Sequence, residues 1–201
     1  VRDIKHITSL SDFQKFLRLC AGRIGQLLNL TSLSIDAGLS LQTVKSWLSI
    51  LEASYIIFFL QPYHNNFNKR LVKTPKLYFY DTALACNLLR ITKAEDIFEH
   101  YARGALFESM IISDFLKKRF NHVVPPNIYF WRDKIGHEID CIIEDGPKIT
   151  PVEIKSSQTI SSDLFEGLVK WSEIAQMNSK DCVLIYGGKE EQKRKMGVAF
   201  P

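Results

Sequence analysis

Several features are scarce in this chain of 201 residues, and each absence excludes a class of protein. The four cysteines lie far apart, and none belongs to a C-x-x-C pair or a cluster with histidine, so structural zinc is not expected. Isolated cysteines in apolar runs predict buried free thiols, which suit a reducing, cytoplasmic setting. The longest apolar run, Tyr55 to Leu60, is far shorter than the roughly 20 residues of a membrane span, so no membrane partner is expected.

Two further absences concern nucleotides and the start of the chain. The phosphate-binding pattern G-x-x-x-x-G-K-[ST] does not occur, so no nucleotide is expected to bind through that loop. No signal peptide precedes the expected fold. The chain begins with Val1 rather than methionine, which indicates part of a longer protein.

Acidic residues are missing from a long segment between Glu52 and Asp81. The basic residues in this interval are Lys69, Arg70, Lys73 and Lys76. The positive charge of the chain is concentrated in its first half, because residues 1–90 balance to +6 and residues 91–201 to −2. A basic segment of this kind is a candidate contact for a polyanion, and a solvated loop is the open alternative.

The first half has the element order of a winged helix-turn-helix. Hydrophobic spacing predicts helices at residues 12–28, 29–37 and 41–53, and β-prone runs predict a hairpin with strands 55–60 and 76–80. In such a module the third helix enters the major groove and the wing follows the backbone. The expected DNA contacts are Gln42, Thr43, Lys45 and Ser46 on that helix, with Lys69 and Arg70 at the wing tip. Docking of a protein is the alternative role.

The second half follows the order helix, three strands, helix, strand. The expected segments are a long helix from 97 to 118, a strand at 128–131, two strands within 136–155, a helix at 162–177 and a strand at 182–186. The expected N-caps of helices along the chain are Ser11, Ser40 and Asp81. The predicted fold is therefore α+β, with a winged helix-turn-helix at residues 1–92 and an α/β domain with an αβββαβ core at residues 93–201.

Charged side chains interrupt the two apolar strands within residues 136–155. Because strand side chains alternate between faces, Asp140, Glu153 and Lys155 can project from the same face of a hairpin. The same alternation places Ile139 and Ile142 on opposite faces. Two carboxylates beside an ammonium are the side chains that a metal-dependent phosphodiesterase uses.

The chemistry assigns a role to each residue of this set. Asp140 and Glu153 supply oxygen ligands for Mg²⁺ or Mn²⁺, and Lys155 orients or deprotonates the attacking water or stabilises the phosphoryl charge. Glu108, on the preceding helix, completes the metal shell. The open alternatives are charges on the solvated face of a sheet and, for Glu108, a solvent-facing helix residue.

The series Gly136-x-x-x-Asp140 and then Glu153-x-Lys155 resembles the PD-(D/E)-x-K nuclease superfamily, which has a restriction-endonuclease-like fold. Over nearly its whole length the chain is similar to the C-terminal region of prokaryotic predicted AAA-type ATPases, through words such as GALFES, YFWRDKIGHEID and PVEIKSSQT. The resemblance implies an ATPase domain ahead of this region in the same polypeptide. It also implies that Glu108, Asp140, Glu153 and Lys155 are the catalytic motif. The proline before the superfamily's Asp is absent, and Ile139 stands there.

Three hypotheses follow from these observations. The first is a DNA-binding, metal-dependent nuclease domain attached to the ATPase. The second is a non-catalytic module that binds nucleic acid or protein and regulates the ATPase. The third is a chiefly structural fragment. The sequence leaves open whether the chain is an enzyme, which nucleic acid it contacts and whether it forms an oligomer.

Overall fold

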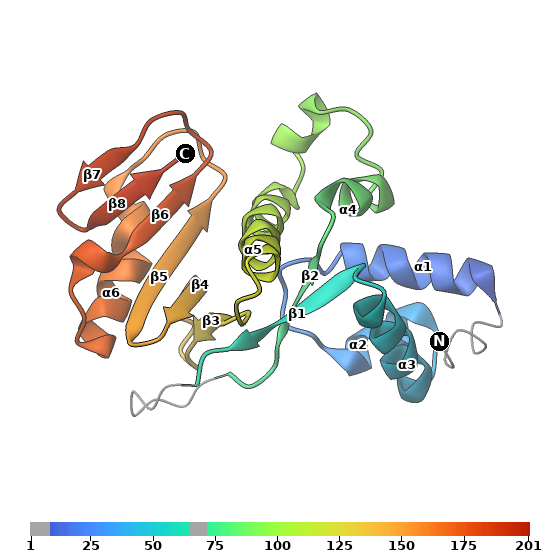
Figure 1. The fold of residues 1–201 in the computed structure, drawn as a ribbon. Helices are drawn as coiled ribbons and strands as arrows, with labels where there is room; N and C mark the ends of the chain where they lie inside the picture. The colour runs from blue at the N-terminus through green and yellow to red at the C-terminus, as the bar shows by residue number, and fades with distance from the viewer. Residues whose placement is uncertain (1–8, 65–71) are drawn as a thin grey trace. The chain divides into compact units, whose positions relative to one another are not determined.

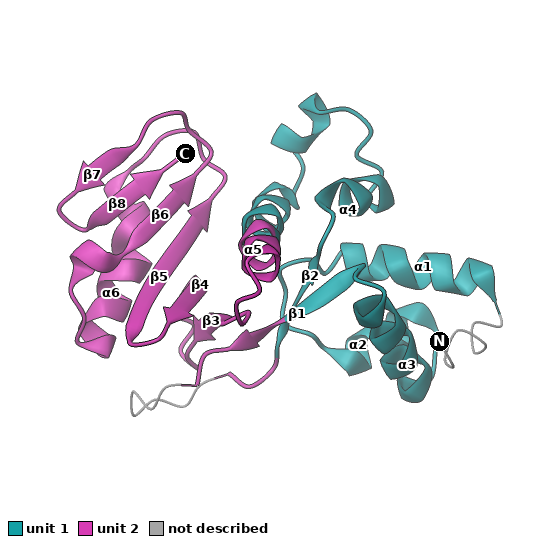
Figure 2. Ribbon diagram, viewed as in Figure 1, with its two compact units in different colours: residues 1–59, 75–113 teal, residues 60–74, 114–201 magenta. Residues whose placement is uncertain are grey.

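The computed structural model describes residues 9–64 and 72–201, so Lys69 and Arg70 lie outside the described residues. The chain divides into two compact units (Figure 2). Unit 1 comprises residues 1–59 and 75–113, and unit 2 comprises residues 60–74 and 114–201. Each unit therefore combines two separate stretches of chain, and the boundary expected between residues 92 and 93 stays a prediction.

Unit 1 contains the helical N-terminal part, coloured blue in Figure 1. Its helices and strands are α1 (Leu10–Ala21), α2 (Leu30–Ala37), α3 (Leu41–Ala53), β1 (Ile57–Pro62), β2 (Lys76–Phe79), α4 (Thr82–Leu88), the 3₁₀ helix η2 (Glu95–Phe98) and α5 (Arg103–Asn121). Strand β2 lies beside β1. Strand β1 and helix α5 both continue into unit 2. Helix α5 begins later than the expected residue 97, because a 3₁₀ turn precedes it.

Side-chain caps determine where several of these helices begin. Ser40 caps α3 and Asp81 caps α4, as the sequence predicts. The prediction of Ser11 as the cap of α1 is wrong, because Ser9 accepts the hydrogen bond from the backbone N–H of Asp12. The helix therefore starts two residues earlier, and Ser11 lies within its first turn.

The core of unit 1 is built around Trp47 of α3. Its ring makes edge-on contacts with the rings of Phe13 and Phe16 of α1, at centroid distances of 5.3 and 5.4 Å. Each such aromatic pair contributes about 1 kcal/mol beyond the burial of its area. With Val44 and Leu48 also buried, α3 packs one side inward and leaves Gln42 and Lys45 exposed on the other.

Unit 2 is a mixed sheet with helices. Its strand order is β1-β3-β4-β5-β6-β8-β7. The further elements are β3 (Ile128–Arg132), β4 (Glu138–Asp145), β5 (Lys148–Lys155), η3 (Ser162–Phe165), α6 (Glu166–Ala175), η4 (Ser179–Asp181), β6 (Val183–Tyr186), β7 (Gln192–Arg194) and β8 (Gly197–Phe200). Antiparallel pairing joins β3, β4 and β5 in succession, whereas β5, β6 and β8 are parallel neighbours.

The largest side chains of unit 2 meet in one hydrophobic core. Trp131 of β3, Trp171 of α6 and Leu184 of β6 are almost completely buried there. The chain is thus mixed α/β, with a helical N-terminal part and a mixed sheet, and its elements from α5 to β6 follow the predicted order. Among the described residues, no helix is both long and apolar enough to cross a membrane.

Candidate active site

Asp140 lies at an irregularity of strand β4. Tyr129 pairs with Ile142 and Trp131 pairs with Ile139, so the one residue of β3 between these pairs faces two residues of β4. Asp140 is the first of those two. An extra residue of this kind is a β-bulge, which bends its strand, re-aims side chains and recurs beside active sites.

The bulge changes which residues of β4 share a face. The sequence predicts Ile139 and Ile142 on opposite faces, and this prediction is wrong. Both belong to the hydrophobic core that also contains Trp131 and Leu168. The extra residue shifts the alternation of β4 by one position, because the side-chain period of a strand is two.

Strand β5 supplies the other two charged residues of the predicted motif. The Nζ atom of Lys155 lies 3.2 Å from Oδ2 of Asp140 and 2.5 Å from Oε1 of Glu153. Oδ2 of Asp140 also accepts a hydrogen bond of 2.9 Å from the backbone N–H of Ile154. Asp140 and Glu153 are each only 8% exposed. The structure therefore brings Asp140, Glu153 and Lys155 together around one ammonium group.

The charge state of Lys155 follows from two opposing effects. Burial by itself lowers the pKa of this ammonium, because removal from water disfavours the charged form. The neighbouring Asp140 and Glu153 carboxylates outweigh burial and raise the pKa of Lys155 above its ordinary value of 10.5. Lys155 is therefore a cation at neutral pH, and it is the resident counter-ion of two buried carboxylates.

Gly167 keeps the space beside Glu153 open. A Cβ atom at this position of α6 would lie 3.7 and 3.8 Å from the two carboxylate oxygens of Glu153. It would also lie 3.4 Å from the carbonyl oxygen of Glu138. A side chain longer than a methyl group would crowd both groups, so the small residue at position 167 leaves room for the Glu153 carboxylate.

The two carboxylates of this site are oxygen donors of the kind that a divalent cation takes. One oxygen of Asp140 and one of Glu153 both contact the ammonium of Lys155. Residues 9–64 and 72–201 contain no group of three or more His, Cys, Asp or Glu residues that could hold a metal. Two carboxylates with waters are nevertheless the usual protein contribution to bound Mg²⁺.

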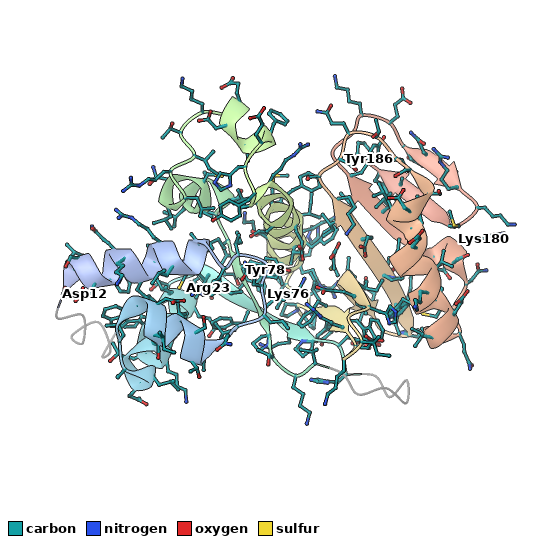
Figure 3. All side chains as sticks on the ribbon, turned by 180° about the vertical axis from the view of Figure 1, so that it is seen from behind. Asp12, Arg23, Lys76, Tyr78, Lys180 and Tyr186 are labelled. Atoms are coloured by element: carbon teal, nitrogen blue, oxygen red, sulfur yellow. The ribbon has the colours of Figure 1, made fainter. Side chains whose placement is uncertain are left out.

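Glu108 lies in unit 1, whereas the other three predicted catalytic residues lie in unit 2. Its Oε1 atom is 3.1 Å from Nζ of Lys76 and accepts a short hydrogen bond from the hydroxyl of Tyr78. Both partners come from β2 and are labelled in Figure 3. The Glu108 side chain is 14% exposed, so it is not the solvent-facing helix residue that the sequence allows as an alternative.

The predicted DNA contacts of α3 differ in exposure. Gln42 and Lys45 are exposed, whereas Thr43 and Ser46 are half-buried. The hydroxyl of Thr43 lies 2.8 Å from that of Ser40, so this group is engaged in the helix cap. Gln42 and Lys45 are therefore the more exposed of the four predicted contacts, and their contact with DNA stays a prediction.

Sequence reasoning missed a second charged cluster next to Asp140. Arg132, the last residue of β3, pairs directly with Glu138, the first residue of β4, and their NH1 and Oε2 atoms lie 3.1 Å apart. Between them Asp133 accepts backbone hydrogen bonds from Ile135, Gly136 and His137. An Asp followed three residues later by Gly is typical of a turn, and this pattern predicts the short connection between β3 and β4.

Two family descriptions match the two halves of the chain. Residues 1–95 match a family described as "Domain of unknown function (DUF8612)". Residues 103–201, which contain all four predicted catalytic residues, match one described as "Domain of unknown function (DUF4143)". Neither description assigns an activity.

Curated relatives extend well beyond the matched region. The chain is 27% identical over 138 residues to the uncharacterized protein Mb2031c of Mycobacterium bovis and, equally, to the uncharacterized protein Rv2008c of Mycobacterium tuberculosis. The match covers 68% of this chain but only 30% of each relative. No solved structure matches the chain significantly. The comparisons thus relate the chain to part of larger proteins whose printed names give no function.

Proposed function

We propose that the chain is the DNA-binding part of a larger ATPase and carries a Mg²⁺- or Mn²⁺-dependent phosphodiesterase site. The observation that supports it best is the convergence of the Asp140 and Glu153 carboxylates on the ammonium of Lys155. Two buried carboxylates and a partly buried ammonium are costly to fold, because each charge loses part of its hydration. Such costs are typical of functional sites.

The residues have distinct roles in this proposal. Asp140 and Glu153 hold the metal, which when bound supplies an activated water and neutralises phosphoryl charge. The Ile154 N–H fixes the orientation of the Asp140 carboxylate. Lys155, protonated at neutral pH, stabilises the negative charge that develops on the phosphate. Glu108 is held in its orientation by Lys76 and Tyr78 of unit 1, and its contribution to the metal shell stays a prediction.

The fold-level part of the proposal rests on element order. Helices α5 and α6 with strands β3 to β6 have the αβββαβ order of restriction-endonuclease-like domains. Helices α1 to α3 followed by β1 and β2 have the order of a winged helix. The exposed side chains of α3 supply a surface for the DNA groove, and the ATPase lies elsewhere in the longer polypeptide.

A plasmid-nicking assay tests the proposed activity. The purified protein is expected to convert supercoiled plasmid to the nicked form in Mn²⁺ or Mg²⁺ and not in EDTA. Asp140→Asn, Glu153→Gln and Lys155→Met are each expected to lower the rate at least 100-fold, because each removes a metal ligand or a charge-stabilising group.

Asp145→Asn is the matched control, because it also neutralises a carboxylate of β4 but at the opposite end of that strand. Equal activity of the three site variants and the wild type would overturn the proposal. DNA retention without metal-dependent nicking would favour the non-catalytic binding module instead.

A further inference from the structure

We propose that Lys73, Arg132 and Lys134, here called the Arg132 patch, bind backbone phosphates of DNA next to the Asp140–Glu153–Lys155 site. The inference rests on the proposed function for the identity of its substrate. It adds the residues that hold the DNA strand, none of which belongs to the motif or to the predicted helix and wing contacts. All three residues lie in unit 2.

Arg132 has guanidinium N–H donors beyond the one that faces Glu138. Its side chain is 37% exposed and its NH1 atom lies 3.1 Å from Glu138, whereas in the described part of the chain its other guanidinium N–H groups have no protein acceptor. A guanidinium carries five N–H donors, in a fork that matches the oxygens of a phosphate. Arg132 can therefore keep its protein partner and bind a phosphate at the same time.

Arg119 of α5, in the same unit, has a structural role and differs from Arg132 in its contacts. Its side chain is only 13% exposed, and it donates to the carboxylate of Asp145 and to the carbonyl oxygens of Pro125 and Glu144. Strand β4 thus ends in an arginine–carboxylate pair on each side. Arg119 donates to three protein acceptors, whereas Arg132 is paired with Glu138 and has more donors left for a ligand.

The pairing of β3 with β4 places Arg132 close to the candidate active site. Its direct partner Glu138 lies two residues before Asp140 on the same strand. Two residues of extended chain span about 7 Å. A strand whose scissile phosphate lies at Asp140 therefore brings a neighbouring phosphate within reach of Arg132.

Lys73, from a distant part of the sequence, is a second cation near Arg132. The backbone N–H of Val72 donates a hydrogen bond of 3.1 Å to the carbonyl oxygen of Arg132. This contact sets the exposed Lys73 beside the end of β3. Lys73 belongs to the segment between Glu52 and Asp81 that contains no acidic residue. The acid-free segment thus returns to the sheet next to Arg132.

Hydrogen bonds fix the turn after Arg132, and this turn carries Lys134, the third cation of the patch. The Asp133 carboxylate accepts three backbone N–H groups of the turn and lies 2.8 Å from Nδ1 of His137. Gly136 has a φ of 104°, which favours glycine. Lys134 is exposed at the tip. Since these bonds fix the turn, the backbone that carries Lys134 and Arg132 needs little ordering when a phosphate binds.

The test is the salt dependence of DNA binding, measured by fluorescence anisotropy of a labelled duplex in EDTA, so that it does not require catalysis. The logarithm of the affinity falls with the logarithm of the salt concentration with a slope of about 0.9 per phosphate contact. The double variant Lys73→Gln/Arg132→Gln is expected to reduce this slope by about 2 and to weaken binding at least tenfold. Glu138→Gln is expected to tighten binding, because it releases the guanidinium.

The matched control is Lys148→Gln/Lys170→Gln, which removes two exposed positive charges elsewhere in unit 2 and should change the slope by less than 0.5. Equal losses in both double variants, or no loss in either, would overturn the patch. Plasmid nicking by the wild type is recorded in parallel. Nicking with an unchanged slope refutes the patch alone, and a reduced slope without nicking refutes the proposed activity alone.

Discussion

The ammonium of Lys155 lies 3.2 Å from the carboxylate of Asp140 and 2.5 Å from that of Glu153, so one cation serves two buried acids. The position between the carboxylates is therefore taken by the protein's own charge. A divalent metal that binds the same oxygens must share or displace this ammonium. In the proposed function Lys155 is therefore both a catalytic group and a competitor of the metal.

The first prediction concerns this competition. Lys155→Met is expected to increase the affinity for Mn²⁺ about tenfold, a change of about 1.4 kcal/mol, because the resident cation is gone. Isothermal titration calorimetry without DNA measures it, and Lys170→Met is the control for an exposed lysine. An affinity that is unchanged or weaker would show that the ammonium does not occupy the cation position.

The second prediction concerns stability. Lys155→Met is expected to lower the free energy of unfolding by about 2 kcal/mol, less than the 3–5 kcal/mol of a fully buried pair, because the Lys155 side chain is 35% exposed. Since the pKa of Lys155 is raised in the folded state, its contribution is complete below pH 10.5 and declines only as the pH rises through the folded pKa. Urea unfolding should thus show a constant difference from about pH 6 to about pH 9.

The third prediction concerns Glu108 and its contacts with Lys76 and Tyr78. Lys76→Met leaves a largely buried carboxylate without its ammonium and should destabilise the protein by about 3 kcal/mol. Tyr78→Phe removes one hydrogen bond and should cost about 1.5 kcal/mol. In a double-mutant cycle, Lys76→Met combined with Glu108→Gln should cost less than the sum of the single changes. Strict additivity in urea unfolding would argue against the pair.

The fourth prediction concerns the turn between β3 and β4. Burial by itself raises the pKa of Asp133, but the hydrogen bonds from His137 and Gly136 hold it below its ordinary value of 3.8. Its contribution to stability is therefore complete above the unfolded-state pKa and is lost as the pH falls through the lower, folded-state pKa. Asp133→Asn should cost about 2 kcal/mol at pH 7 and progressively less below about pH 4. A difference that does not shrink on acidification in urea titrations would contradict this role.

The fifth prediction concerns helix α3. Lys45→Gln is expected to reduce the salt slope of duplex binding by about 1, because an exposed lysine on this helix neutralises one phosphate. Lys93→Gln is the control, since Lys93 is also exposed in unit 1 but lies outside the helical module. Equal slopes for the two variants would favour protein docking by α3.

Much of the local structure follows from short-range patterns. The caps Ser40 and Asp81 and the E-x-K spacing on β5 needed only neighbouring residues, because capping and strand alternation act within a few positions. The prediction of the α1 cap was wrong because two neighbouring residues could serve as the cap. Ser9 and Ser11 are both suitable residues, and the sequence offers no decisive preference between them.

The details of the candidate site depend on contacts between distant segments. The bulge at Asp140 arises from the register of β3 against β4, which no pattern within β4 encodes, and it overturned the predicted face of Ile142. The partners of Glu108 come from β2, more than one element away in the chain. The Arg132 patch requires the hydrogen bond from Val72, across a long stretch of sequence.

The sequence by itself determined the four candidate site residues and the order in which the elements occur, because residue type and periodicity are local properties. Tertiary structure alone decided that Lys155 neutralises Asp140 and Glu153 together, and that the Arg119 side chain is 13% exposed whereas that of Arg132 is 37% exposed. The physical reason is that ion pairing and burial are set by which strands become neighbours. Strand neighbours are chosen by the packing of the whole sheet.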